Sequence, residues 1–253
     1  MSLRDYLINK EKILSIYFTA GFPTKNSIID IILELQNSGV DLIEVGVPYS
    51  DSLVDGPTIQ ASNEVALKNG ISLEYIFDEL KNNKEKIKIP LVLMSSYNPI
   101  LQYGKEKFIS DCVEANIASL IIPDMPIDEF ISDYKNELDK NNIGFSFLIT
   151  SRTSDVRIKY LDSLSSGFLY AVSQDSTTGK EFVLDEQRKE FFSRLRNLNL
   201  KNPFLIGFGI KDHDTFNLAC TQAKGAIIGS AFIRFLQKNS DISKLADFVK
   251  EIR

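Results

Sequence analysis

The sequence predicts an α/β fold, a single (β/α)8 TIM barrel that occupies residues 1–253 as one domain. Two observations carry this prediction: short β-rich apolar runs recur eight times, and segments with helical patterning separate them. Most of the runs are unbroken apolar stretches, as expected for parallel strands that are buried on both faces. Strand–helix alternation implies a parallel sheet, and eight repeats suggest closure into a barrel, which commonly needs about 250 residues.

The expected strands follow one another along the whole chain. They lie at Ile13–Ala20, Asp41–Val47, Pro90–Ser96, Ser119–Ile122, Gly144–Ile149, Gly167–Val172, Pro203–Phe208 and Gly225–Ile228. No linker rich in Pro, Gly or Ser divides this series. We therefore expect one domain, although a chain of 253 residues is long enough for two.

Three segments place apolar residues at helical spacing and so predict amphipathic helices. Their apolar faces are Ile28, Ile31, Ile32 and Leu35, then Phe108, Ile109, Cys112 and Val113, and finally Leu245, Phe248 and Ile252. Gly39 is the expected stop of the first helix. Two connections are long: Pro48–Ile89 has room for a loop and two helices, and Ser173–Asn202 begins with the polar run SQDSTTGKE. Both follow strand C-termini, where the active sites of barrels lie.

Composition argues against several classes of protein. The net charge of −5 argues against general binding to nucleic acid or to an anionic membrane, so an anionic substrate must be held by local features. Cys112 and Cys220 have no metal-ligand or CxxC spacing, and Cys112 is expected to be a buried free thiol. No apolar signal segment begins the sequence, and no apolar run approaches the ~20 residues of a membrane span. We therefore expect a cytoplasmic protein.

Carboxylates mark the most informative stretch, IEVGVPYSDSLVDGPTIQ at Ile43–Gln60. Glu44 lies within an apolar strand, where it either points into the barrel mouth or forms a structural ion pair. Partial burial would raise the pKa of Glu44 and suit it to proton transfer near neutral pH. Asp51 and Asp55 lie in the following loop, and Asp55 is either a second reacting carboxylate or an ordinary turn former before Gly56. A mobile loop would let Asp55 cover a ligand and exclude water.

Glycine-containing loops follow the last two expected strands. GFGI at Gly207–Ile210 and IGSAF at Ile228–Phe232 each open a helix, and small residues there allow backbone N–H groups to approach a phosphate. Loops in these two positions form the usual phosphate site of this barrel class. The alternative is that the glycines only permit tight packing. Thr178 and Gly179, after the sixth expected strand, would add a further N–H donor.

Other chemistries lack support in the sequence. His213 is the only histidine and is expected at the surface or in the first turn of a helix, so no metal site and no Ser-His-Asp or Cys-His arrangement is predicted. The glycine strings match neither a Walker loop nor the full dinucleotide pattern. No expected strand ends in the Lys of a Schiff-base aldolase. Acid–base chemistry without a cofactor is therefore favoured.

At this point the motifs resemble one family, the tryptophan synthase α chain, over nearly the whole sequence. Its hallmark E-x-G-x-P-[FY]-S-D-P-x-A-D-G-P-x-I-Q reads here as EVGVPYSDSLVDGPTIQ at Glu44–Gln60. Shorter matches are YFTAG at Tyr17–Gly21, SYNPIL at Ser96–Leu101, IIPDMP at Ile121–Pro126, YAVS at Tyr170–Ser173, TG at Thr178–Gly179, FGI at Phe208–Ile210 and GSA at Gly229–Ala231. The long hallmark is highly specific, because unrelated phosphate-binding barrels do not carry it.

The resemblance implies an activity, partners and a role for each matching residue. The chain would cleave indole-3-glycerol phosphate to indole and glyceraldehyde 3-phosphate without a cofactor of its own. Glu44 would be the principal acid–base catalyst, Asp55 would hold or deprotonate the indole N–H, and Tyr170 would help position Glu44. The indole pocket would comprise Tyr17, Tyr97 and Asp124, and the phosphate site Thr178, Gly179, Phe208, Gly209, Gly229 and Ser230. An α2β2 heterotetramer with a pyridoxal-phosphate β subunit, which consumes indole, is expected.

Three positions depart from the family pattern. Ser52 stands where the family usually has Pro, Val54 where it has Ala, and STTG at Ser176–Gly179 where it has GVTG. These loops touch the β subunit in the family, and the changes alter loop stiffness. One alternative is therefore a catalytically weak subunit that mainly activates the β chain, although the retained carboxylates argue against it. A second alternative is a phosphate-sugar epimerase or isomerase barrel, which would need a metal or other base residues.

Overall fold

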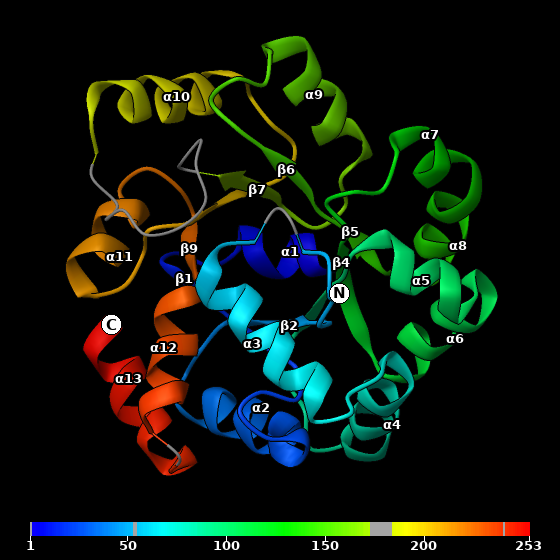
Figure 1. Ribbon diagram of the computed structural model, residues 1–253. Helices are drawn as coiled ribbons and strands as arrows, with labels where there is room; N and C mark the ends of the chain where they lie inside the picture. The colour runs from blue at the N-terminus through cyan, green and yellow to red at the C-terminus, as the bar shows by residue number, and fades with distance from the viewer. Residues whose placement is uncertain (1, 53–54, 173–183, 240) are drawn as a thin grey trace.

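The computed structural model describes residues 2–52, 55–172, 184–239 and 241–253, and it confirms the predicted TIM barrel (Figure 1). Among these residues all strand pairs are parallel, and the sheet order is β5-β4-β3-β2-β1-β9-β8-β7-β6. The strands are β1 Ile13–Thr19, β2 Leu42–Gly46, β3 Leu91–Met94, β4 Ile117–Ile121, β5 Gly144–Phe145, β6 Phe147–Ile149, β7 Leu169–Val172, β8 Phe204–Gly207 and β9 Gly225–Ile228.

One expected strand, Gly144–Ile149, is two strands in the structure because it is interrupted at Ser146. β5 pairs with β4 on one side, whereas β6 pairs with β7 on the other. Ser146 connects both sides: its N–H donates to Leu120 O (2.9 Å), and its Oγ accepts from Phe168 N–H (3.2 Å). The two ends of the sheet order are thus consecutive pieces of chain, and they close the barrel at one strand position.

Helices surround the sheet and alternate with the strands (Figure 1). They are α1 Leu3–Ile8, α2 Ile28–Asn37, α3 Pro57–Lys68, α4 Leu73–Asn83, α5 Tyr97–Tyr103, α6 Lys105–Glu114, α7 Ile127–Glu129, α8 Lys135–Lys140, α9 Asp155–Leu164, α10 Glu186–Asn197, α11 His213–Cys220, α12 Ser230–Lys238 and α13 Leu245–Ile252. Two 3-10 helices, η1 Lys25–Ser27 and η3 Ile242–Lys244, and a π-helix, η2 Phe130–Tyr134, complete the set. The long connection after β2 contains α3 and α4, as its length predicted.

The predicted apolar faces are buried on α2 and α13, and on α6 with one exception. Val113 is 40% exposed, so its assignment to the buried face of α6 was wrong. The buried face of α6 includes Asp111 instead. Asp111 accepts hydrogen bonds from the Tyr103 hydroxyl (2.5 Å) and Lys81 Nζ (3.0 Å). A carboxylate with two such donors tolerates burial, which leaves Val113 on the solvent side. Cys112 is a buried free thiol, as expected.

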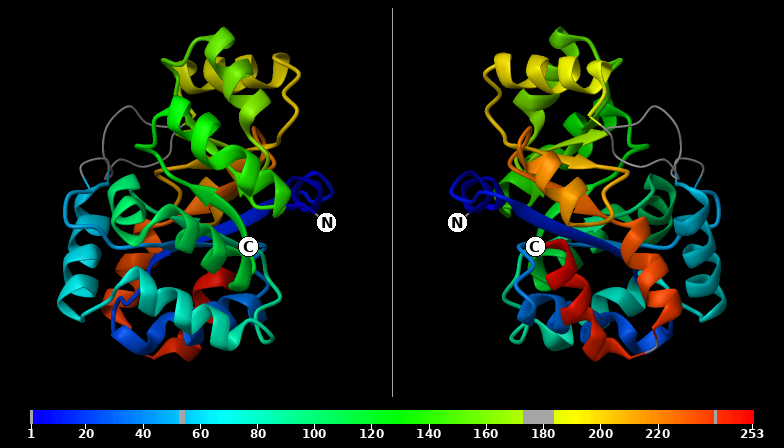
Figure 2. Two further views of the ribbon diagram at one scale, coloured as in Figure 1. Left: turned by 90° about the vertical axis from the view of Figure 1, so that its right-hand side faces the viewer. Right: turned by 90° about the vertical axis from the view of Figure 1, so that its left-hand side faces the viewer.

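The N-terminal helix α1 closes the barrel at the end where the strands begin. Leu3 and Leu7 are buried and belong to the cluster of side chains that fills the barrel interior, together with Val92 and Leu205. Figure 2 shows α1 and α3 on opposite sides of the barrel. Because α1 covers this end, a ligand can reach the interior only from the opposite end, where the strands finish.

Candidate active site

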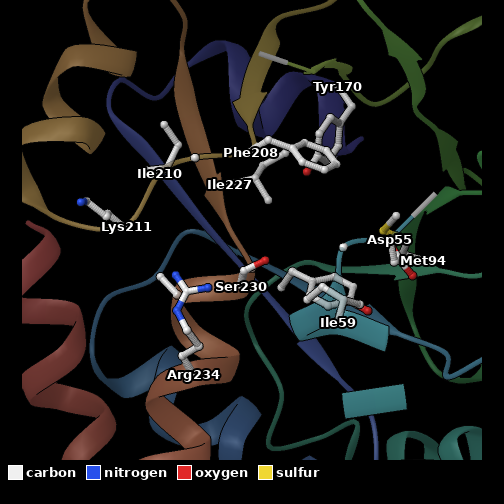
Figure 3. Close-up of a pocket in the computed structure, with 15 residues that line it drawn as sticks. Asp55, Ile59, Met94, Tyr170, Phe208, Ile210, Lys211, Ile227, Ser230 and Arg234 are labelled. Carbon is white, nitrogen blue, oxygen red and sulfur yellow. The ribbon is translucent and has the colours of Figure 1, made fainter. Parts of the chain in front are cut away.

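A pocket of about 390 Å³ opens at the carboxyl ends of the strands (Figure 3). Its wall combines strand ends, the loop before α3, and the loops after β8 and β9. It is lined by Tyr17, Asp55, Gly56, Ile59, Met94, Tyr170, Phe208, Gly209, Ile210, Lys211, Ile227, Gly229, Ser230, Ala231 and Arg234. A largely apolar cavity with a few polar groups is what a small organic ligand requires.

Glu44 is a fully buried carboxyl on β2, in register with Tyr17 of β1, which lines the pocket. Its Oε1 accepts a hydrogen bond from Ser15 Oγ (2.8 Å), and its Oε2 has no hydrogen-bond partner among the described residues. Burial raises the pKa of Glu44 to about 7, and the Ser15 hydrogen bond opposes that rise. No ion pair to Glu44 is found within the described ranges, which favours proton transfer over a structural salt bridge.

Asp55 lies at the pocket wall just before α3. Its backbone N–H donates to Ser52 O (3.1 Å). Burial raises the pKa of Asp55 to about 6, while hydrogen bonds from Ser52 and Asn63 oppose the rise. Ser52 Oγ also accepts from Asn63 Nδ2 (3.1 Å). The serine that replaces the family's usual Pro therefore takes part in the polar contacts around Asp55.

Two tyrosines form the aromatic part of the pocket. Tyr17 and Tyr170 are both buried, and burial together with the nearby carboxylates Glu44 and Asp55 raises the pKa of each phenol far above neutral pH. Both hydroxyls therefore stay protonated and can donate hydrogen bonds. Tyr170 also packs edge-on against Phe208, with ring centroids 6.1 Å apart. A flat, aromatic ligand fits such a wall.

The loops after β8 and β9 form a part of the pocket that is suited to an anion. Phe208 and Gly209 follow β8 with positive φ angles of 73° and 80°, and the left-handed conformation is unusual for a residue such as Phe208. Gly229 and Ser230 open the nine-residue helix α12, whose first N–H groups lack intrahelical partners. Figure 3 shows Ser230 near Arg234, with Lys211 on the same side of the pocket.

Some residues predicted for the site lie elsewhere. Tyr97, Asp124 and Glu44 are not among the residues that line the pocket, although Glu44 is in register with Tyr17, which does line it. Instead, the exposed Asp124 accepts a hydrogen bond from Tyr97 N–H (2.8 Å) at the start of α5, and the Tyr97 ring packs against Tyr134. Thr178 and Gly179 fall outside the described residues, as do Val54 and Ser176.

Several lining residues were not predicted from the sequence, among them Met94, Ile59, Lys211 and Arg234. Met94 had a usable signal, because it ends a strand whose carboxyl end faces the barrel mouth. Arg234 had a weaker one, since it follows Ser230 by about one helical turn and therefore shares its face. Lys211 follows Gly209 by only two residues, but nothing in the sequence distinguished it from the other lysines of the chain.

His213 begins α11, as expected, and is exposed. Its Nδ1 lies 3.2 Å from Ile252 O, and its Nε2 lies 2.7 Å from Asn217 Nδ2. Among the residues that the structure describes, no group of three His, Cys, Asp or Glu side chains could hold a metal ion. No helix in the same part of the chain is long and apolar enough to span a membrane.

Comparison with known proteins decides the family. The family model described as "Tryptophan synthase alpha chain" matches residues 4–252. The chain belongs to the tryptophan synthase alpha chain family. It is 51% identical to the tryptophan synthase alpha chain of Flavobacterium johnsoniae over 243 residues (96% of each chain), and 49% identical to that of Flavobacterium psychrophilum over 250 residues (99% of this chain and 98% of the relative).

Solved structures agree with this assignment. The tryptophan synthase A-subunit of Pyrococcus furiosus is 30% identical, with a TM-score of 0.86 over 96% of this chain and 98% of that one. A chain of tryptophan synthase from M. tuberculosis is 25% identical, with a TM-score of 0.86 over 100% of both. As a tryptophan synthase alpha chain, the protein is a carbon–carbon lyase of tryptophan biosynthesis that acts on indole-3-glycerol phosphate.

Proposed function

We propose that the pocket at the barrel mouth is where the chain cleaves indole-3-glycerol phosphate, with Glu44 and Asp55 as the proton-handling groups. The observation that carries this proposal is the state of Glu44: a buried carboxyl whose pKa lies near 7 and whose Oε2 has no partner among the described residues. Such a group gives and takes a proton with similar ease at neutral pH. Tyr17 and Tyr170 supply the aromatic wall for the indole ring.

The proposed chemistry needs no group beyond these side chains. Glu44 donates a proton to the ring carbon that bears the glycerol chain, and the Asp55 carboxylate stabilises the positive charge on the ring N–H. The Glu44 carboxylate then takes the proton of the glycerol hydroxyl next to the ring. As that hydroxyl becomes a carbonyl, the carbon–carbon bond breaks and its electron pair returns to the ring as neutral indole. Glu44 ends the cycle protonated, as it began.

The phosphate is assigned to the end of the pocket formed by Phe208, Gly209, Gly229 and Ser230. Backbone N–H groups and the N-terminus of α12 favour a dianion there. Anchoring the phosphate at a distance orients the scissile bond relative to Glu44 and restricts its motion. Thr178 and Gly179 remain proposed members of this site, and Tyr97 and Asp124 are proposed to support the indole end through the start of α5.

The proposed partner is a β subunit that carries pyridoxal phosphate and consumes indole in an α2β2 heterotetramer. Asp55 lies just before α3, in a segment that must admit substrate and then cover it, so docking would raise turnover by favouring the closed state. The free thiols Cys112 and Cys220 are compatible with the reducing cytoplasm, the compartment we propose.

One assay tests the proposal directly: release of indole from indole-3-glycerol phosphate by the purified chain, with and without the cognate β subunit. Cleavage that depends on Glu44 supports the proposal. Absence of cleavage under both conditions would remove the lyase assignment from this pocket. A saturating rise in rate with the β subunit supports coupling between the subunits. Activation of the β subunit without cleavage would instead favour the weak-subunit alternative that the altered loop residues left open.

A further inference from the structure

Ser15 and Glu44 form a buried, hydrogen-bonded pair inside the barrel. Ser15 lies on β1, two residues before Tyr17, and Glu44 lies on the neighbouring strand β2. Both side chains are fully buried, and the Ser15 hydroxyl donates to Glu44 Oε1 at 2.8 Å. Among the described residues, this is the one hydrogen bond found to a side-chain oxygen of Glu44. Ser15 precedes the YFTAG match at Tyr17–Gly21 and was not predicted as a site residue.

The direction of this hydrogen bond distinguishes the two carboxyl oxygens. A protonated carboxyl carries its hydrogen on one oxygen only. Because Oε1 accepts from Ser15, the hydrogen is placed on Oε2, the oxygen without a partner among the described residues. The same bond stabilises the carboxylate form, so it limits the rise in pKa that burial causes. Both effects act on the proton that the reaction moves.

We propose that Ser15 is a positioning residue for Glu44: its hydroxyl occupies Oε1 and thereby assigns proton transfer to Oε2. The inference rests on the function proposed above. A contrast within the barrel supports a dedicated role for Ser15. The buried serines Ser119 and Ser146 lie within hydrogen-bond distance of each other (Oγ to Oγ, 3.3 Å), whereas Ser15 directs its hydroxyl to the carboxyl.

The test compares Ser15→Ala, Ser15→Thr and a matched control, Ser119→Ala, which also removes a buried hydroxyl from the barrel. In Ser15→Ala the carboxylate loses its stabilising donor, so the pKa of Glu44 should rise by about one unit. The alkaline limb of the kcat/KM profile, where Glu44 loses its proton, should move to higher pH by the same amount. KM for indole-3-glycerol phosphate should change little, because Ser15 does not line the pocket.

Ser15→Thr keeps the hydroxyl, so this variant should have the wild-type pH profile of kcat/KM. The control Ser119→Ala should have the wild-type profile as well. Titration of the Glu44 side-chain carboxyl by ¹³C NMR reads the same pKa without relying on activity. A Ser15→Ala protein with an unchanged Glu44 titration and an unmoved alkaline limb would overturn the positioning role, even if it were less stable. If the NMR shift appears while the wild-type chain cleaves no substrate, the proposed function fails but the Ser15–Glu44 coupling stands.

Discussion

Tyr170 lies directly over Gly207 of the neighbouring strand, so closely that a Cβ atom on Gly207 would be 2.2 Å from the Tyr170 hydroxyl oxygen. The same arrangement recurs between β1 and β2, where a Cβ on Gly46 would be 2.2 Å from the Tyr17 hydroxyl oxygen. Each glycine thus provides the space that its tyrosine occupies. The aromatic wall of the pocket depends on these two small residues.

Gly207→Ala should displace Tyr170 and lower kcat/KM at least ~10-fold, because about 1 Å of misplacement in an active site can be that costly. Overpacking should also reduce the free energy of unfolding by about 1–3 kcal/mol. A double-mutant cycle with Tyr170→Leu identifies the contact: Gly207→Ala should cost clearly less stability when Tyr170 is already removed. Equal costs in both backgrounds would show that another neighbour resists the new methyl group.

Glu44→Gln keeps the shape of the side chain and removes its titratable proton. We expect kcat to fall at least ~100-fold, the lower end for general acid–base catalysis. Steady-state kinetics of indole release measures this directly, and circular dichroism controls for folding. Turnover within a few-fold of wild type would exclude Glu44 from the proton-transfer steps.

Stability offers a second measurement on the same variant. The folded pKa of Glu44 is raised from 4.5 to about 7, so its ionisation destabilises the folded state as the pH rises from 4.5 to about 7. The Gln variant lacks this penalty. In urea denaturation, the free energy of unfolding of the variant should therefore rise relative to that of the wild type between pH 4.5 and about 7, by up to about 3 kcal/mol. A difference that is independent of pH would mean that Glu44 does not titrate in this range.

The kcat/KM profile should be bell-shaped, with its maximum between about pH 6 and 7. Asp55 must be ionised to hold the ring N–H, so activity falls as the pH drops through the Asp55 pKa of about 6. Glu44 must be protonated to begin the reaction, so activity falls as the pH rises through its pKa of about 7. The Asp55→Asn variant should lose most of its activity, and its residual kcat/KM should no longer fall as the pH drops through about 6. A wild-type profile that is flat from pH 5 to 9 would contradict both assignments.

Gly209→Val tests the phosphate end. Gly209 has a φ angle of 80°, which a β-branched residue adopts only with strain, and a side chain there would hinder approach of the phosphate to the backbone. KM for indole-3-glycerol phosphate should rise far more than the dissociation constant of free indole. If both ligands weaken equally, general distortion of the pocket is the better explanation.

Arg234→Gln tests whether the exposed cation adds to phosphate binding. Arg234 lines the pocket one helical turn after Ser230, and its Nη1 lies 3.5 Å from Thr58 Oγ1. Because exposed charges are screened, we expect only about a 3- to 5-fold rise in KM. Lys238→Gln, an exposed residue on the same helix that does not line the pocket, is the matched control. Equal KM values for the two variants would exclude a contribution of Arg234 to phosphate binding.

Much of the molecule was predictable from local pattern. Unbroken apolar runs located the strand positions of the barrel, and helical spacing located α2, α6 and α13, because burial imposes a period on the sequence of each element. Glu44 was identifiable for the same reason: a carboxyl in an apolar strand must have a partner or a function. The glycines after β8 and β9 were identifiable by their place in the barrel class.

Tertiary structure decided what no local pattern contains. The register of β1 against β2 brings Ser15 to Glu44 and leaves Oε2 without a partner among the described residues. Closure of the sheet interrupts a strand at Ser146, because the residues on its two sides pair with different neighbours. The pocket gathers Lys211 and Arg234 but not Tyr97 or Asp124. These outcomes depend on contacts between residues far apart in the chain, and such contacts form only when the barrel closes and excludes water.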